Sequence, residues 1–558
     1  MPSHNVSYPS TGQRRWWGIY TALYLVGVLW LLLGIFRPYY VYDGGIPVVG
    51  AVRILDGELP YRDFYANYSA GQFYLTAAVF GLTGPSLLAQ RVLSVIVRSL
   101  IALIAFALMR RLAPRSVAIV AWGLILAWLS FFGAFGYTGF PALLCSLASM
   151  LFMSRALGQG CGNGRLATGG LCASGLAAGL TFLFRQDFGV YIGAAQVLFL
   201  AAYSLAPLPL AFDKPRLRGL LRSWSLFAAG VVTVVLGPVV YFSVLLGPGE
   251  LFHTLFLWPY ELTKNFRGLP YPRPWASLEH FETSGVGLAG LLLGIRNTLP
   301  FSLPIVVFGI QGWKLLKKWW LQRQPTSPRF WMKLGVLLYG ALSFNQVFHR
   351  SDPLHLFPTF CAAVILLVAL LGEWAAARSG HQRQVVLIGL ALLLLMAPPS
   401  LLIGVASLPA FDDVGTAAAD APRARGVPID PDQLAALAYI RHHTEPDEPI
   451  FVGNLRHDQV VWNDIVFYFL AERPIATRYH HFDPGMTTTY AIQQEIIDEL
   501  ERHDVRHVVV FAGGLPGNEP NHSTDPGSRL LDQHLQNRYR PVFRTGRYEV
   551  RQRHDSPS

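Results

Sequence analysis

Long apolar runs constrain the fold of this chain more than any other feature. A helix that crosses the hydrocarbon core of a membrane needs about 20 mostly apolar residues. Runs of this kind recur from near the N-terminus to residue 405, and the candidate spans are 17–36, 90–109, 116–133, 138–154, 167–183, 188–206, 223–246, 297–313, 330–346, 353–371 and 385–405. The sequence therefore predicts an all-α polytopic membrane bundle with about eleven transmembrane helices.

The charged residues divide the chain into two parts. Residues 1–411 contain twelve Asp and Glu, whereas residues 412–558 contain twenty-two, together with fifteen Arg and no Lys. A soluble protein has about a quarter charged residues, and only the second part approaches that composition. We therefore expect a transmembrane domain over 1–411, with a long loop at 37–89, followed by a soluble C-terminal domain over 412–558.

The C-terminal domain combines helical and strand patterns. Residues 431–443 and 486–502 have the apolar spacing of helices. Residues 449–452 and 505–511 are short apolar runs bounded by turn residues, as in buried strands. These signals predict a small α/β domain with three to five strands.

Clusters of basic residues orient the bundle in the membrane. Cytoplasmic loops carry an excess of Lys and Arg. All basic clusters fall on the same side as Arg14 and Arg15 if the short apolar segment 69–84 lies in the interface as a helix instead of spanning. These clusters are Arg110/Arg111/Arg115, Arg155/Arg165, Lys214/Arg216/Arg218/Arg222, Lys314/Lys317/Lys318/Arg323 and Arg378/Arg383. The predicted location is a bacterial inner membrane, with a cytoplasmic N-terminus and an extracytoplasmic C-terminal domain.

This topology gathers carboxylates on the outer side of the membrane. Acidic residues contribute little to orientation, so the topology does not require them to gather. Ten of the twelve acidic residues of the first part fall there: Asp43, Asp56, Glu58, Asp63, Asp187, Glu250, Glu261, Glu279, Glu282 and Asp352. We therefore expect the chemistry at this face. The net charge of +11 does not indicate nucleic acid as a partner, because the basic residues lie in short clusters between apolar runs.

The first outer loop offers two candidate catalytic carboxylates. Asp43 follows the first span by a few residues, between Tyr and Gly, and a charge so close to hydrocarbon is costly unless it is paired or used. Asp63 is the second candidate, although its neighbour Arg62 also permits a simple local ion pair. A plain interfacial loop is the structural alternative for both.

Two outer turns carry residues suited to an anionic phosphate. Arg185 and Asp187 interrupt the apolar sequence between the fifth and sixth spans, and a second such turn follows the ninth. Turns usually draw on Gly, Ser and Asn, and a phosphate needs a bidentate guanidinium with a second donor. The candidate donors are Arg185, His349, Arg350 and His355, with Asp187 and Asp352 as possible acidic partners. The structural alternative is that both turns are solvent-exposed connections between spans and bind nothing.

Motifs of soluble enzymes are absent from the sequence. It has no Walker loop, no GxSxG and no HExxH. The pairs His442–His443 and His480–His481 are adjacent, and neighbouring side chains point in different directions, so they make poor metal sites. We therefore predict neither a metal nor a cofactor.

Several motifs together resemble bacterial members of the protein O-mannosyltransferase-like group of the C-type glycosyltransferase superfamily. They are the Asp after the first span, Gly57-Glu-Leu-Pro-Tyr-Arg-Asp-Phe64, Tyr68-Ser-Ala-Gly-Gln-Phe-Tyr-Leu-Thr-Ala77, Gly84 before Arg91, Arg350-Ser-Asp-Pro-Leu-His355, and Phe467-Tyr-Phe-Leu-Ala-Glu-Arg-Pro-Ile-Ala-Thr-Arg478.

The resemblance implies a hexosyl or pentosyl transferase that uses a polyprenyl-phosphate-linked sugar at the outer face and inverts the anomeric centre. The acceptor would be a glycan, a lipid or a protein, and the catalytic loop would be 37–89. The family's base, an acidic residue of the first outer loop, maps onto Asp43. Many relatives carry a second acidic residue between the third and fourth spans, where this chain has Phe131-Phe-Gly-Ala-Phe-Gly-Tyr137, and Asp63 or Asp187 could take its place.

Two other functions fit a polytopic chain. A lipid or sugar transporter or flippase tends to have inverted repeats and charges at the membrane midplane. Here no repeat is visible, and the ionisable residues gather at the outer ends of the spans. The other alternative is a receptor or assembly protein whose C-terminal domain binds a partner.

Overall fold

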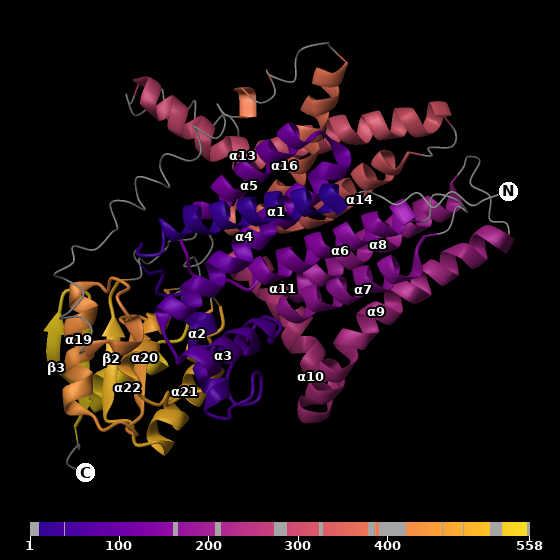
Figure 1. The fold of residues 1–558 in the computed structure, drawn as a ribbon. Helices are drawn as coiled ribbons and strands as arrows, with labels where there is room; N and C mark the ends of the chain where they lie inside the picture. Colours follow the sequence, from indigo (N-terminus) through magenta and orange to yellow (C-terminus); the bar gives the residue numbers. More distant parts are fainter. Residues whose placement is uncertain are drawn as a thin grey trace, which may run out of the picture.

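The predicted spans form a bundle of helices in the structure, a computed structural model (Figure 1). It describes residues 10–37, 39–159, 166–206, 214–272, 287–322, 327–377, 384, 387–389, 420–459, 461–483, 485–513 and 527–554. The bundle helices are α1 (Ser10–Leu32), α4 (Leu87–Leu112), α5 (Arg115–Ser130), α6 (Gly139–Gln159), α7 (Thr168–Phe184), α8 (Gln186–Leu205), α9 (Lys214–Leu246), α13 (Gly287–Gln322), α14 (Pro328–Ser343) and α16 (Pro353–Ala376).

Each of the first ten predicted spans coincides with one of these helices. The eleventh, 385–405, lies almost entirely outside the described residues. Six helices in the described part of the chain are long and apolar enough to cross a membrane, namely α4, α6, α8, α9, α13 and α16. The multi-pass bundle is confirmed, and the count of about eleven spans stays a prediction.

Short helices fill the connections at one end of the bundle. The loop predicted at 37–89 contains α2 (Gly45–Leu55) and α3 (Gly71–Thr83). The sequence predicted the second of these at 69–84, and its place in the membrane interface stays a prediction. After α9 the chain continues through α10 (Pro248–Phe252), η1 (His253–Leu257), α11 (Trp258–Leu262) and η2 (Thr263–Arg267), and α15 (Asn345–His349) precedes α16.

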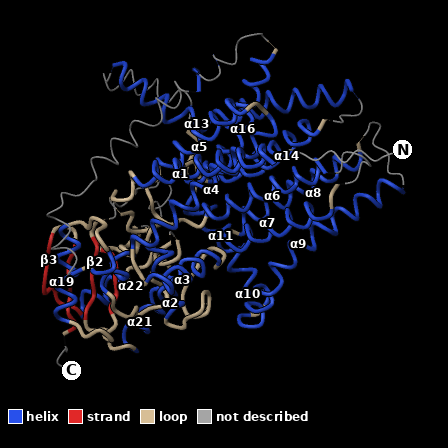
Figure 2. The backbone as a smooth tube through the Cα atoms, in the orientation of Figure 1, coloured by secondary structure: helices blue, strands red, loops and turns tan. Residues whose placement is uncertain are grey.

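The C-terminal domain is a four-stranded sheet with helices, and Figure 2 shows strands only in this part. The strand order is β1-β2-β4-β3; β1 and β2 are parallel, and the other pairs are antiparallel. Its elements are η3 (Pro422–Ala424), α19 (Pro431–His443), β1 (Ile450–Asn454), α20 (Ile465–Ala471), α21 (Tyr490–Arg502), β2 (His507–Phe511), α22 (Leu530–Arg538), β3 (Tyr539–Thr545) and β4 (Tyr548–Arg553). The predicted small α/β fold is confirmed.

The first loop and the C-terminal domain share one hydrophobic core. Ile46 and Val49 of α2 and Phe73 of α3 are buried in the same cluster as Phe467 of α20 and Val452 of β1. In Figure 1, α2 and α3 accordingly lie between the C-terminal domain and the bundle. We call the end of the bundle that meets this domain the tail-side end.

Close packing of α2 on α20 requires a residue without a side chain. A Cβ atom at Gly45 would lie 2.5 Å from the Cβ of Ile465 and 2.9 Å from the backbone nitrogen of Val466. The backbone nitrogen of Val466 also donates a hydrogen bond to the Val41 carbonyl oxygen at 3.2 Å. The first turn of α2 is therefore fixed directly against the C-terminal domain.

Gly45→Ala is expected to lower the thermal stability of the purified protein in detergent, by about 1–3 kcal/mol of unfolding free energy, because overpacking forces the backbones apart. Gly81→Ala in α3 is the matched control, since no atom lies within 4 Å of its Cβ position. That control should be neutral or stabilising by up to about 1 kcal/mol, as Ala favours a helix over Gly. Equal melting temperatures for the two variants would contradict the close contact.

Candidate active site

Arg185 lies at the centre of a polar cluster at the tail-side end of the bundle. It is the single residue between α7 and α8, and its side chain is only 3% exposed. Its Nε donates to Asp187 Oδ1 at 3.0 Å, and its Nη1 donates to the hydroxyl of Tyr137 at 2.5 Å. The guanidinium also lies over the rings of Tyr68, at 5.2 Å, and Phe188, at 4.6 Å. The cost of burying a charge must be offset by nearby partners, which here are a carboxylate, a hydroxyl and two aromatic rings.

The neighbours of Arg185 keep it charged. Burial alone would lower the pKa of the guanidinium, but Asp187, Tyr137 and Tyr68 raise that pKa well above its usual value. The cluster thus holds a permanent cation away from bulk water. In this environment of lower dielectric constant, the cation attracts an anion more strongly than it would in water.

A second cation is joined to the first through α15. Gln346 donates from Nε2 to Asp187 Oδ2. Four residues along, Arg350 Nε donates to Asp352 Oδ2 at 2.7 Å, and Asp352 Oδ1 lies 2.8 Å from Nδ1 of His355. Asp352 also caps α16, accepting from the backbone nitrogen of His355 at 2.9 Å. Burial disfavours the charged form of Asp352, yet His355 and Arg350 hold the pKa of its carboxyl well below the usual range.

Tyr137 connects this cluster to the first loop. Burial raises the pKa of its phenol, Arg185 lowers it, and Tyr68, Asp43 and Asp352 each raise it further. The charges of both carboxylates therefore act on the same hydroxyl. Of the eight residues that the sequence singled out, the structure pairs Arg185 with Asp187, and Asp352 with both Arg350 and His355, while the charge of Asp43 acts on Tyr137.

Asp43 is half-buried in the turn that leads into α2. The carbonyl oxygen of Tyr42 accepts hydrogen bonds from the backbone nitrogens of Gly45 at 2.9 Å and Ile46 at 3.3 Å, which starts the helix directly after the carboxylate. The positive end of the helix dipole favours an ionised group at this position. The start of α2 thus fixes the backbone on both sides of Asp43.

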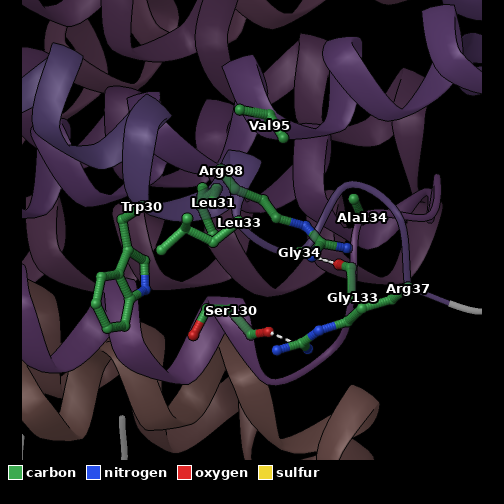
Figure 3. A pocket seen from close by; sticks show the side chains of 10 residues that line it. All are labelled: Trp30, Leu31, Leu33, Gly34, Arg37, Val95, Arg98, Ser130, Gly133 and Ala134. Atoms are coloured by element: carbon green, nitrogen blue, oxygen red, sulfur yellow. Dashed lines mark hydrogen bonds between the residues drawn. The ribbon is translucent and has the colours of Figure 1, made fainter. Parts of the chain in front are cut away.

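Buried arginines fix the segment that carries Tyr137. Arg37, after α1, donates from Nη1 to the carbonyl oxygen of Ser130 at 2.9 Å. Arg98 of α4 donates to the carbonyl oxygens of Leu129, at 3.2 Å, and of Gly133. Figure 3 shows the two guanidiniums on either side of this turn, around a cavity of about 20 Å³. Both satisfy carbonyl groups at the C-terminal end of α5, which have no partner within the helix.

An apolar cavity of about 380 Å³ adjoins the polar cluster. Its wall includes Ser69 and Leu255, and both are held by the side chain of Gln186, the residue after Arg185. Gln186 Oε1 accepts from the backbone nitrogen of Ser69 at 3.0 Å, and its Nε2 donates to the Leu255 carbonyl oxygen at 2.9 Å. Tyr74 of α3 and Tyr241 of α9 also line the cavity and are 40% and 50% exposed, so it reaches the surface of the bundle.

The other two predicted residues lie apart from the cluster. Asp63 forms an ion pair with Arg62 at 2.6 Å and accepts from the backbone nitrogen of Leu59 at 2.8 Å, which is the local pair that the sequence allowed. The side chain of His349, at the end of α15, is exposed. Its carbonyl oxygen accepts from the backbone nitrogen of Leu269 at 3.2 Å.

Sequence reasoning missed the residues that connect the cluster. Tyr137 stands in an aromatic segment, Tyr68 directly before the predicted interfacial helix, and Gln346 beside more conspicuous charges. The one available signal was the position of Tyr137, in the segment where relatives of the resembled group carry an acidic residue. Among the described residues, no group of three or more His, Cys, Asp or Glu side chains is arranged to hold a metal ion.

Solved structures share this fold at low sequence identity. ArnT from Cupriavidus metallidurans, bound to undecaprenyl phosphate, aligns over 97% of this chain and 98% of its own, with 15% identity and a TM-score of 0.55. The oligosaccharyltransferase of Archaeoglobus fulgidus, in complex with Zn and sulfate, aligns over 88% of this chain and 68% of its own, with 14% identity and a TM-score of 0.51. No protein-family model and no curated protein sequence matches the chain.

These likenesses show that the chain has the fold of the C-type glycosyltransferases. The fold implied by the resemblance is confirmed, and membership of the O-mannosyltransferase-like group stays a prediction.

Tyr137→Phe is expected to lower stability by about 1–3 kcal/mol, because the buried Arg185 guanidinium loses an acceptor. Tyr191→Phe is the matched control: its hydroxyl accepts at 3.2 Å from Asn345, a neutral and exposed donor. The control should change stability by less than about 0.5 kcal/mol. Thermal unfolding of both variants in the same detergent measures the difference, and a destabilised Tyr191→Phe beside an unchanged Tyr137→Phe would refute the role given to Tyr137.

Proposed function

We propose that the protein is a membrane glycosyltransferase that takes a sugar from a polyprenyl-phosphate donor and transfers it to an acceptor with inversion. The observation that carries this proposal is the pair of carboxylate-bound cations, Arg185 and Arg350, beside Tyr137, a hydroxyl on which the charge of Asp43 also acts. This arrangement occurs in a chain with the C-type glycosyltransferase fold, whose solved members include one bound to undecaprenyl phosphate.

The proposed reaction is a single displacement at the anomeric carbon. The acceptor hydroxyl attacks this carbon while Asp43 takes the hydroxyl proton as general base. A new C–O bond forms to the acceptor, and the bond between the anomeric carbon and the phosphate oxygen breaks. The electron pair of the broken bond stays on the leaving polyprenyl phosphate, so no strong general acid is needed.

Arg185 and Arg350 are proposed to stabilise the leaving phosphate. Its negative charge grows as the bond breaks, and fixed cations in a partly dry site lower the energy of that transition state. The Arg350 side chain is 13% exposed and thus more accessible than that of Arg185. His355, which interacts electrostatically with both arginines, is the proposed further donor.

The apolar cavity is proposed to hold the isoprenoid chain of the donor. Burial of apolar surface is favourable, and this cavity is lined almost throughout by apolar and aromatic side chains. Its wall is tied through Gln186 to the residue next to Arg185, which suits a molecule with a phosphate at one end and hydrocarbon at the other. With the predicted topology, both sites face the extracytoplasmic side of a bacterial inner membrane.

Asp43→Asn is expected to reduce turnover on the order of 10²- to 10⁴-fold, the typical contribution of a general base. The assay uses purified protein in liposomes with radiolabelled undecaprenyl-phosphate sugars and cell-envelope extract, and it follows the release of undecaprenyl phosphate and of labelled product. Asp56→Asn, exposed in the same loop, is the control and should keep wild-type turnover.

Three outcomes of this experiment separate the alternatives. Turnover within a few-fold of wild type in Asp43→Asn would remove it as base, and a loss confined to Asp63→Asn would transfer the role to that residue. Movement of labelled lipid across the bilayer without a covalent product would instead establish a flippase.

Val239→Trp is expected to raise the KM for a long-chain donor by about tenfold, because the added ring occupies the cavity that Val239 lines. Val240→Trp is the matched control, since that neighbouring side chain is 50% exposed and does not line the cavity. The KM of each variant is measured with an undecaprenyl donor and with a two-isoprene donor, whose short chain should not depend on the cavity. Equal effects of Val239→Trp on the two donors would contradict a chain-binding cavity.

A further inference from the structure

A buried carboxylate of the C-terminal domain binds two separate parts of the first loop. Asp483 is 1% exposed. Its Oδ1 accepts from the hydroxyl of Tyr42 at 3.2 Å, and its Oδ2 accepts from the hydroxyl of Tyr65 at 3.1 Å and from Asn67 Nδ2 at 2.7 Å. An ionised carboxylate only accepts hydrogen bonds, and these three donors converge on it from a loop more than 400 positions away in the sequence.

The first of these contacts leads to the carboxylate side of the candidate site. Tyr42 precedes Asp43, and its carbonyl oxygen accepts the hydrogen bonds that start α2. Its ring also stacks on Trp462 of the C-terminal domain, with the ring centroids 5.8 Å apart. The backbone and the side chain of Tyr42 are therefore both fixed, directly before Asp43.

The other contacts lead to the cationic side. The carbonyl oxygen of Asn67 accepts from Gln186 Nε2 at 3.1 Å, and the ring of the next residue, Tyr68, lies against Arg185. Tyr65 donates its own hydroxyl hydrogen to Asp483 and accepts from Trp258 Nε1 at 3.2 Å. One carboxylate therefore contacts both the residue before Asp43 and the segment that touches Arg185.

We propose that Asp483 is a positioning residue, which holds Asp43 at a fixed distance from the Arg185 cluster through Tyr42 on one side and Asn67 on the other. This inference rests on the proposed function, in which Asp43 is the base and Arg185 stabilises the leaving phosphate. It assigns the C-terminal domain a part in catalysis through the geometry of the first loop. A displacement of about 1 Å between reacting groups can cost on the order of 100-fold in rate.

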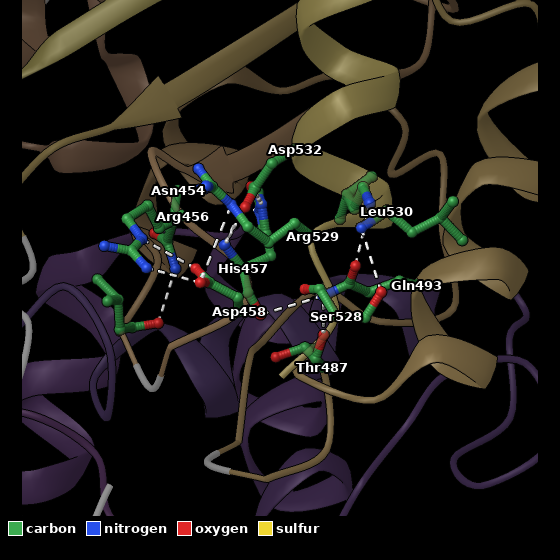
Figure 4. Close-up of polar contacts among 12 residues, drawn as sticks. Asn454, Arg456, His457, Asp458, Thr487, Gln493, Ser528, Arg529, Leu530 and Asp532 are labelled. Atoms are coloured by element: carbon green, nitrogen blue, oxygen red, sulfur yellow. Dashed lines mark hydrogen bonds and ion pairs between the residues drawn. The ribbon is translucent and has the colours of Figure 1, made fainter. Parts of the chain in front are cut away.

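A second buried carboxylate of the same domain provides a matched control. Asp532 accepts from the backbone nitrogen of His457 at 3.0 Å and lies 2.7 Å from its Nδ1 (Figure 4). The Nε2 of His457 accepts a hydrogen bond from the backbone nitrogen of Asn454. The ring hydrogen is therefore on Nδ1, which donates a hydrogen bond to Asp532. This pair is as buried as Asp483, and its contacts remain within the C-terminal domain.

Asp483→Asn is expected to lower the maximal rate of undecaprenyl phosphate release by about 10- to 100-fold in the folded full-length protein. Asp532→Asn should lower the melting temperature and leave that rate within about twofold. Tyr42→Phe, which removes only the hydroxyl, should lower the rate in the wild-type background and have no further effect in Asp483→Asn. A rate in Asp483→Asn equal to that of Asp532→Asn, or independent effects of Tyr42→Phe and Asp483→Asn, would overturn the proposal.

Hydrogen–deuterium exchange gives a readout that does not need activity. Asp483→Asn should speed exchange in peptides covering 40–47 and 65–69, whereas Asp532→Asn should speed it around 454–459. If Asp43→Asn keeps its activity while Asp483→Asn shows this exchange pattern, the proposed base is wrong and the positioning of the loop stands. If Asp43→Asn is inactive and exchange at 40–47 is unchanged in Asp483→Asn, the positioning role is wrong. Should Asp483→Asn fail to fold, the rate and exchange of Tyr42→Phe and Tyr65→Phe decide the question.

Discussion

The burial of the Arg185 guanidinium is the constraint on which the rest of the candidate site depends. A cation with a 3% exposed side chain must be compensated locally, and each compensating group comes from a different part of the chain. Asp187 comes from α8, Tyr137 from the segment after α5, and Tyr68 from the loop before α3. Satisfying one charge therefore brings the ends of several helices together, and Gln346 of α15 joins them through Asp187, four residues before Arg350.

The first loop could not hold its part of this arrangement alone. Helices α2 and α3 are short, and short helices are marginal in water without tertiary packing. Their apolar faces are buried in a core shared with α20 and β1, so the folding of the loop depends on the C-terminal domain. The domain and the loop are far apart in sequence and act as one structural unit, and this is why contacts such as that between Tyr42 and Asp483 link the domain to the candidate site.

The sequence predicted the parts of the structure that follow from local patterns. Apolar runs gave ten helices because hydrophobic length is a local property, and α19 was predicted at 431–443 from its spacing alone. The helix α2 was missed because its apolar residues face the C-terminal domain, whose position no local pattern contains. Tyr137 was missed for a similar reason: an aromatic residue among aromatics shows no chemistry until Arg185 is placed beside it. The charged residues of the outer turns were recognised because charge near hydrocarbon is costly, and that cost is visible in a sequence.

The charges of the candidate site bear on how the proposed reaction would be accelerated. Arg185 is paired with Asp187, and Arg350 with Asp352, so neither arginine needs to reorganise when a phosphate approaches. A donor phosphodiester carries one negative charge, and the leaving phosphate monoester gains charge as the sugar departs. The arginines therefore attract the leaving phosphate more strongly than they attract the donor. Stronger interaction with the transition state than with the ground state is what raises a rate, and arginines held in place by their carboxylate partners meet that requirement without reorganisation.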